Sequence, residues 1–179
     1  MSFARVRALV VVGVLAVVAV VFVAVTLVRD TQAGKEAGEA CPPGAKLADT
    51  RLRLPKDIKI NVYNATDTQG LANSVKTDFQ NRQFQVLKSG NEPKNKGVDD
   101  VAVLRFGPKG LGSYHVLKAY FLNEATPDFQ IDRTDDVVDV VIGSDFKQLA
   151  TITEVSQALA QGSGGPQLPD GTCADPNLT

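Results

Sequence analysis

The most uniform apolar stretch of the chain lies near its N-terminus. Residues 8–28, "ALVVVGVLAVVAVVFVAVTLV", are 21 consecutive positions without a charge. A helix of this length crosses a hydrocarbon core of about 30 Å. A run with no polar face is hard to bury in a small domain. The pattern therefore predicts a transmembrane helix over 8–28, with residues 1–7 forming the cytoplasmic N-terminus.

A cleaved signal peptide is the alternative for this segment. Its apolar region usually spans about 7–15 residues and ends at a small-residue cleavage site. The run here is longer, and "RDTQAGKEAGEA" follows it without an A-x-A site at its end. The "GEAC" ending at Cys41 is similar to a lipoprotein box, but Glu39 is charged and the box lies too far from the apolar run. These features favour an uncleaved anchor.

Flanking charges give the orientation of the predicted span. Arg5 and Arg7 precede it, whereas Arg29 and Asp30 follow it. Positive charge is retained on the cytoplasmic side, so we expect the chain after about residue 30 to lie outside. That outer part carries 16 basic and 19 acidic side chains, a formal net charge of −3. A surface that follows phosphates is normally basic, so we expect no nucleic-acid partner.

Beyond the span, composition divides the chain into three parts. Residues 29–55 are rich in Gly, Pro and mixed charges and predict a linker, and residues 161–179 predict a flexible tail. Between them, residues 56–160 have the size of one small domain.

Within this domain the hydrophobic period alternates between two and about 3.6. Ile58, Ile60 and Val62 alternate with polar residues, which predicts a strand with one wet face. From Thr68 the apolar residues recur at three and four positions, the stripe of a helix. The same reading predicts strands at 83–87, 101–106 and 137–143, a short strand in "PDFQID" at 127–132, and helices at 114–122 and 144–161. The strand at 137–143 is Val-rich and predicted to be buried on both faces, and the last helix is predicted to begin at an N-cap, Ser144.

A faint repeat supports this order. Gly70-Leu71 and Gly110-Leu111 each open a helix, and "FQV" at 84–86 and "FQI" at 129–131 each follow one. The two halves predict a β-α-β-β-α-β domain of the α+β class, a split βαβ arrangement with both helices on one face of the sheet and an additional C-terminal helix.

Two cysteines, Cys41 and Cys173, flank the predicted domain. In an oxidising compartment the default is a disulfide between them. Two free or intermolecular thiols remain the alternative.

The segment "INVYNATDTQG" breaks a strand and opens a helix without the Gly-Lys-Ser/Thr of a P-loop. Asn64 begins an N-glycosylation triplet, but its side chain is also suited to satisfying turn amides, and Gly70 to close packing in the first helical turn. "FGPKGLGS" at 106–113 places Lys109 at a helix N-terminus, where anions bind. Its glycine spacing is not a dinucleotide fingerprint, and Pro108 removes one donor, so a tight turn is favoured.

The sequence contains few candidate catalytic residues. His115 is the only histidine and lies inside a predicted helix, where a surface or half-buried structural role is favoured over a general base. The acidic clusters at Asp99–Asp100 and Asp132–Asp136 lie in predicted loops, where charges are usually solvated, and "DRTDD" lacks the spacing of an EF-hand. We expect no cofactor, no metal and no catalytic residue.

The residues "IKINVYNATDTQGLANSV", "VAVLRFGP" and "DVVIGSDF" together resemble the LytR C-terminal domain family over about residues 57–147. The matching positions are a strand ending at Asn64, then Gly70-Leu71-Ala72, Gly107-Pro108 and Gly143-Ser144-Asp145-Phe146. The family occurs at the end of LytR-CpsA-Psr envelope glycopolymer ligases and alone on membrane-anchored actinobacterial proteins. The chain has no room for the ligase domain, so the resemblance implies a non-catalytic role in maintaining the cell envelope.

The leading hypothesis is an extracytoplasmic interaction module, held at the plasma membrane by residues 8–28, that binds an envelope glycan or an envelope protein. The candidate ligand contacts are Asn61, Tyr63, Asn64 and Lys109. A structural subunit of an envelope assembly and an envelope-polymer-modifying enzyme are the alternatives.

Overall fold

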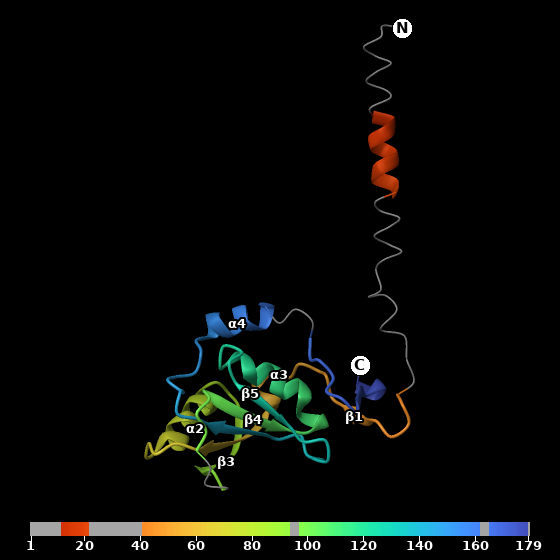
Figure 1. Ribbon diagram of the computed structural model, residues 1–179. Coiled ribbons are helices and arrows are strands. Elements are labelled where there is room, and N and C mark those ends of the chain that lie inside the picture. The colour runs from red at the N-terminus through yellow and green to blue at the C-terminus, as the bar shows by residue number, and fades with distance from the viewer. Residues whose placement is uncertain (1–11, 22–40, 94–96, 162–164, 179) are drawn as a thin grey trace, which may run out of the picture. The chain divides into compact units, whose positions relative to one another are not determined.

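The computed structural model describes residues 12–21, 41–93, 97–161 and 165–178, which form two separate units (Figure 1). In the first unit, residues 12–21 are helical, as expected for the middle of the predicted span. Within the described residues no helix combines the length and the apolar character needed to cross a membrane, and the rest of 8–28 lies outside them.

The second unit runs from Cys41 to Thr179 and contains all the labelled elements. Its strands are β1 (Lys46–Ala48), β2 (Lys59–Asn64), β3 (Gln85–Asn91), β4 (Ala102–Phe106), β5 (Thr126–Phe129), β6 (Val138–Ile142) and β7 (Thr172–Ala174). Its α-helices are α2 (Leu71–Asn81), α3 (Leu111–Ala119) and α4 (Ile152–Gln161), and short 3-10 turns cover η1 (Pro55–Asp57), η2 (Pro108–Gly110) and η3 (Pro176–Leu178).

Five strands form the main sheet in the order β3-β2-β6-β4-β5. β2 is parallel to β3, β4 is parallel to β5, and α2 and α3 connect the two pairs as β-α-β units. The predicted α+β class and the β-α-β-β-α-β order are therefore present. The units are not split, however, because the strands of each pair are direct neighbours. β6 instead joins the two units, parallel to β2 and antiparallel to β4.

The sequence of β6 explains its central position. Val138, Val140, Val141 and Ile142 are all fully buried, and such a strand is best placed where both of its edges and most of its two faces are covered. Asp139 is the exception, so the expectation of burial on both faces is wrong at this position.

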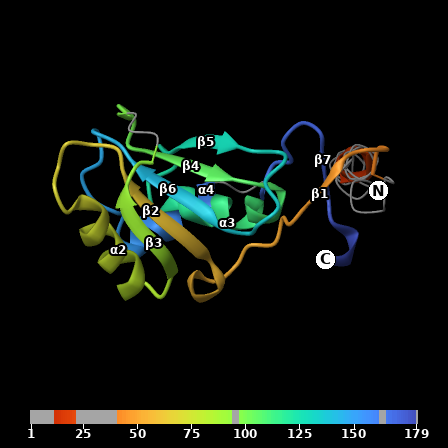
Figure 2. The ribbon, with the colours of Figure 1, turned by 90° about the horizontal axis from the view of Figure 1, so that it is seen from below.

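The core lies on one face of the sheet, against the helices. Ile60 and Val62 of β2 are in register with Val138 and Val140 of β6, and Leu104 of β4 is in register with Val140. From the helix side, Phe79 of α2 packs edge-on against Phe84 and Leu117 of α3 is fully buried. Figures 1 and 2 show α3 and α4 on this side, while no labelled element covers the opposite face, which we call the open face.

The last helix begins later than predicted. Residues 144–151 are not helical, and α4 starts at Ile152 rather than after Ser144. Thr151 provides the cap, because its backbone N–H and hydroxyl both donate to Glu154 Oε2, at 2.7 and 2.8 Å. Glu154 N–H in turn donates to Thr151 Oγ1 at 3.4 Å, which completes the reciprocal pattern of a capping box.

A second, two-stranded sheet pairs β1 with β7 in parallel. It includes residues that the sequence pattern assigned to the linker and to the tail, so the compact unit extends beyond 56–160 at both ends. The segment after β1 packs on the domain: Asp49 N–H donates to Pro108 O, and Gly112 N–H donates to Asp49 O, at 3.0 and 2.8 Å.

Candidate functional site on the open face of the sheet

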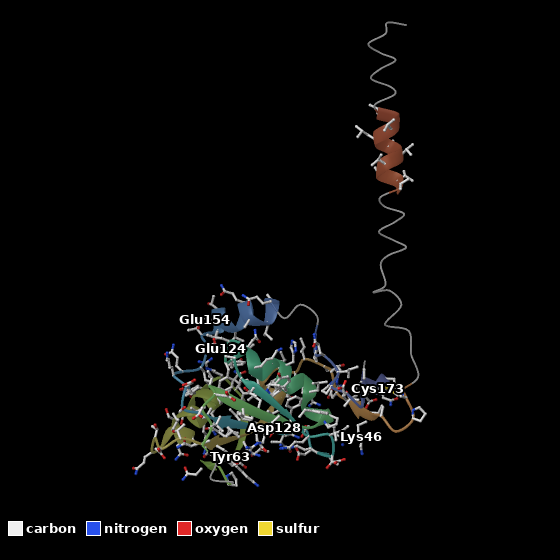
Figure 3. The ribbon with its side chains drawn as sticks, viewed as in Figure 1. Lys46, Tyr63, Glu124, Asp128, Glu154 and Cys173 are labelled. Atoms are coloured by element: carbon white, nitrogen blue, oxygen red, sulfur yellow. A yellow bond between two sulfur atoms is a disulfide. The ribbon has the colours of Figure 1, made fainter. Side chains whose placement is uncertain are left out.

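The polar positions of β2 point to the open face. Lys59, Asn61 and Tyr63 alternate with the buried residues of the strand, as the period of two predicted. The register then sets Asn61 beside Asp139 of β6, and Asp139 beside Arg105 of β4. Three neighbouring strands thus present polar side chains on one surface. Figure 3 shows Tyr63 on the side of the domain away from Glu154 of α4.

Asp139 is the centre of a hydrogen-bonded network on this face. Its Oδ1 accepts from Asn61 Nδ2 at 2.7 Å, and its Oδ2 accepts from Arg133 Nη1 at 2.8 Å. Arg133 Nε also donates to Asp135 Oδ1 at 2.9 Å. Burial lowers the pKa of Arg133, but its hydrogen bonds with the two aspartates outweigh burial and raise the pKa overall. The guanidinium is therefore held as a fixed positive charge.

One acceptor of this network is left without a partner. Asn61 Oδ1 is buried and makes no hydrogen bond within the described residues. Because Asn61 Nδ2 donates to Asp139, the orientation of the amide is fixed, and the oxygen must face the other way.

A second network lies on the same face around Arg105. Arg105 Nη1 is 2.9 Å from Glu92 Oε1, and Arg105 Nε is 3.0 Å from Asp128 Oδ2. Glu92 is only 2% exposed, so this pair is shielded from solvent and holds the guanidinium in one geometry. Figure 3 shows Asp128 on the same side of the domain as Tyr63.

Tyr63 lies among these charges. Burial raises the pKa of its phenol, and the negative charges of Asp139 and Glu92 raise it further. Tyr63 therefore stays neutral at physiological pH and offers a ring and a hydroxyl group. The hydroxyl makes no hydrogen bond within the described part of the chain. A half-buried tyrosine in a frame of fixed ion pairs is suited to contact a polar partner.

Asn64 has a structural role in the turn that follows β2. The residue is 6% exposed, and its Nδ2 donates to Thr68 O at 2.7 Å. Its Oδ1 accepts from Thr66 N–H at 3.0 Å and from Thr66 Oγ1 at 2.8 Å. The expectation that Asn64 satisfies the turn amides is confirmed. The side chain is thus almost fully buried and committed to the turn.

Gly70 does not have the packing role that we expected. A Cβ at this position would meet nothing within 4 Å, but the backbone φ is +78°. The residue is required at the N-cap of α2 because this left-handed conformation disfavours side chains.

Lys109 is separated from the other predicted contacts. It is exposed in η2, directly after β4, whereas Tyr63 and Asn64 end β2. Because β4 is antiparallel to β6 and β2 is parallel to it, these carboxyl ends lie at opposite ends of the sheet. The α3 N-terminus is not a phosphate cradle either, since Gly112 N–H is taken by Asp49 O.

Several residues of the open face were not predicted from the sequence. Arg105, Arg133 and Asp139 organise it, and the acidic cluster 132–136 is ion-paired at Asp135 and Asp136 rather than merely solvated. The sequence pattern nevertheless indicates two of these residues, Arg105 and Asp139. A single charge at an alternate position of an apolar strand marks the wet face, as Arg105 does in "VAVLRF" and Asp139 in "VVDVVI".

A disulfide joins Cys41 and Cys173, with Cα atoms 5.8 Å apart, which confirms the predicted pairing. It lies beside Leu47, the register partner of Cys173 in the β1–β7 sheet. A group of His, Cys, Asp or Glu side chains able to hold a metal ion is absent from the described residues.

Comparison with known proteins gives three matches. The family described as LytR cell envelope-related transcriptional attenuator matches residues 57–146. Cell envelope integrity protein Cei of Mycobacterium tuberculosis is 30% identical over 118 residues, 65% of this chain and 50% of that relative, so the match spans about half of the relative's length. The solved soluble domain of a conserved hypothetical secreted protein from Mycobacterium marinum is similar with a TM-score of 0.52 and 26% identity, covering 70% of this chain and 84% of that one.

Proposed function

We propose that this chain, which belongs to the LytR cell envelope-related transcriptional attenuator family, is a non-enzymatic protein that contributes to cell envelope integrity by binding a wall glycan. Residues 8–28 anchor it in the plasma membrane, and the domain from Cys41 onward lies on the outer side. There the open face is the binding surface.

Three observations support this location and role. The relative of this chain in Mycobacterium tuberculosis is named for cell envelope integrity, and the structural neighbour is the soluble domain of a secreted protein. The disulfide between Cys41 and Cys173 is typical of an oxidising compartment, outside the cytoplasm.

The observation that carries the proposal is the open face itself. A sheet with one face on the core leaves the other for solvent or for a partner. Here that face carries Tyr63 beside two arginines whose geometry is fixed by carboxylates at 2.8 to 3.0 Å. Because the two arginines are paired with four carboxylates, the face has no excess positive charge to attract a polyanion. It offers ordered donors and acceptors and one ring, which suits the hydroxyl groups of a glycan.

Crosslinking in intact cells tests the proposal. A photo-crosslinking amino acid replaces Tyr63 in the full chain, and a matched control replaces Gln80, which is exposed on α2. We expect position 63, but not position 80, to form adducts that migrate as a smear and collapse after digestion with a wall hydrolase. A discrete adduct of protein size would instead identify an envelope protein as the partner. Equal or absent crosslinking at both positions would contradict binding through the open face.

A further inference from the structure

A cavity lies apart from the open face, between α3, the end of β5 and the C-terminal segment. Its volume is about 550 Å³, within the range of small-ligand sites. Its walls come from α3, from β4 and β5, and from residues 165–169, which we call the C-terminal strap. Phe106 and Phe129 belong to the core side of their strands, so the cavity is on the helix side of the sheet.

Aromatic rings form one wall of the cavity. Tyr114 of α3 stacks on Phe106 with ring centroids 4.1 Å apart and planes 9° from parallel. Phe129 of β5 lies 5.6 Å from Phe106. Phe106 is only 2% exposed and Phe129 is tilted 53° from it, so the half-buried rings of Tyr114 and Phe129 form an angled wall that suits the apolar face of a sugar ring.

The polar side chains that line the cavity are Tyr114, His115, Lys118, Gln161 and Gln167, and Lys118 is the cation among them. Lys118 Nζ lies 5.9 Å from the centre of the Tyr114 ring and forms no ion pair within the described residues. No carboxylate is present among the described residues that line the cavity.

His115 contributes a second polar side chain to the cavity wall, next to Lys118 on α3. The residue is only 5% exposed, lines the cavity, and makes no hydrogen bond within the described part of the chain. Among the described residues the fully buried side-chain atom without a partner is Asn61 Oδ1, so the ring nitrogens of His115 keep some accessible surface, and the imidazole reaches the cavity that it lines. The residue as a whole is nevertheless buried. The expectation of a surface or half-buried histidine is therefore wrong. His115 and Lys118 are three positions apart on α3 and share one helix face, where one anionic group can reach both.

We propose that this cavity binds an acidic saccharide, with the sugar ring against Tyr114 and Phe129 and its carboxylate at Lys118 and His115. It is a second site, and it rests on the proposed function in one respect, since a domain on the wall side of the membrane would meet such sugars. The carboxylate can belong to a uronic acid or to a lactyl ether.

The C-terminal strap fixes one wall of this site. Its last residue, Pro169, accepts hydrogen bonds from Thr172 N–H at 3.1 Å and from Thr172 Oγ1 at 2.6 Å. Thr172 begins β7, next to the disulfide at Cys173. The pairing of β7 with β1 therefore holds the strap over α3.

Saturation-transfer NMR on the full chain in detergent micelles tests the site. The probes are N-acetylmuramate and glucuronate, each compared with its neutral counterpart, N-acetylglucosamine or glucose. We expect at least one acid to bind about tenfold more tightly than its neutral counterpart at low salt, the effect of one charge-assisted contact. The acid that binds identifies the source of the carboxylate.

Matched lysine variants locate the binding. Lys118→Gln is expected to abolish the preference for the acid, and Lys118→Arg to retain it. Lys76→Gln, at the corresponding position of α2, is the control and should bind as the wild type does. The proposal is overturned if neither acid binds, if acid and neutral sugar bind equally, or if Lys118→Gln keeps the preference. If a variant fails to fold, the comparison of acidic and neutral sugars on the wild-type chain still tests the proposal. The proposed function is tested separately, by crosslinking at position 63 on the open face. A negative result in the sugar-binding experiment would therefore overturn the cavity site and leave the proposed function standing.

Discussion

Cys41 and Cys173 are joined by a disulfide although 132 positions separate them in the sequence. The bond lies at the β1–β7 sheet, where Leu47 is in register with Cys173, and it connects the two ends of the compact unit. The ends of the domain are thereby tied to each other, and the C-terminal strap is tied to the segment that precedes β1.

Removing this bond should destabilise the domain without changing its fold. A crosslink that closes a loop of more than 100 residues restricts the unfolded chain, and such bonds typically contribute about 2–4 kcal/mol. We expect the double variant Cys41→Ser, Cys173→Ser to lose about that much free energy of unfolding in a urea titration. Wild-type chain treated with reductant is the control and should behave like the variant. An unchanged midpoint in both would show that the bond does not stabilise the domain.

Asp49 is predicted to govern stability in acid. The residue is 3% exposed; burial alone would raise the pKa of its carboxyl, but hydrogen bonds from Arg51 and Arg53 outweigh it and lower the pKa to about 2. A lowered pKa contributes stability that is full above the unfolded value of 3.8 and is lost as the pH falls toward 2. Asp49→Asn should therefore lower the free energy of unfolding by about 2 kcal/mol at neutral pH. The variant should also lose less stability than the wild type as the pH falls toward 2.

Asp57→Asn is the matched control for that measurement. Asp57 is exposed in η1, so its substitution should leave the free energy of unfolding within about 0.5 kcal/mol of wild type. If Asp49→Asn and Asp57→Asn have equal effects, Asp49 does not stabilise the packing of the N-terminal segment on η2 and α3.

His115 provides a second pH dependence, in a different range. Burial lowers the pKa of its imidazole, and the positive charge of Lys118 lowers it further. Because the imidazole binds a proton less readily in the folded than in the unfolded chain, the free energy of unfolding is highest above pH 6.5, the ordinary pKa of histidine. It decreases as the pH falls below that value. We expect the urea midpoint of the wild type to fall between about pH 7.5 and 5.5, where histidine titrates. His115→Gln should show a smaller change, and an identical change in both proteins would contradict the assignment, since the chain has one histidine.

Gly112 is predicted to be intolerant of a side chain. A Cβ on Gly112 would collide with the carbonyl oxygen of Arg51, because the N-terminal segment crosses the first turn of α3 there. Gly112→Ala must displace backbone on one side, so we expect a loss of about 2 kcal/mol or more in thermal or urea unfolding. Gly90→Ala in β3 is the control, since a Cβ at Gly90 meets nothing within 4 Å. Similar losses for both variants would show that the close approach at Arg51 is not what limits position 112.

The pattern of the sequence predicted the elements of the main sheet, but not their full arrangement. The alternation around Ile60 identified β2 and the side chains of its open face, because burial of one strand face leaves a local signal. The strands β1 and β7 were missed, since each has three residues and their partners are more than 120 positions apart. The central position of β6 also depends on contacts between distant segments. The start of α4 was within reach, because Thr151 and Glu154 have the spacing of a capping box.

The site was predicted in part. Asn61 and Tyr63 were placed on the open face by the alternation of β2, and the turn role of Asn64 followed from its side-chain chemistry. Lys109 was grouped with them because the sequence gives no strand direction, and it lies at the other end of the sheet. The arginine partners of Asp139 and Glu92 come from other strands and loops, so only the register brings them together.

The most direct test of the account is the permeability of cells that lack this protein. A deletion strain takes up a small dye, and it is complemented with the wild-type chain, with Tyr63→Ser, or with Gln80→Ser as an exposed control on α2. At equal protein levels in the membrane fraction, we predict that the wild type and Gln80→Ser restore the barrier to the dye and that Tyr63→Ser does not. Full restoration by Tyr63→Ser would contradict the claim that the open face of the domain maintains the envelope.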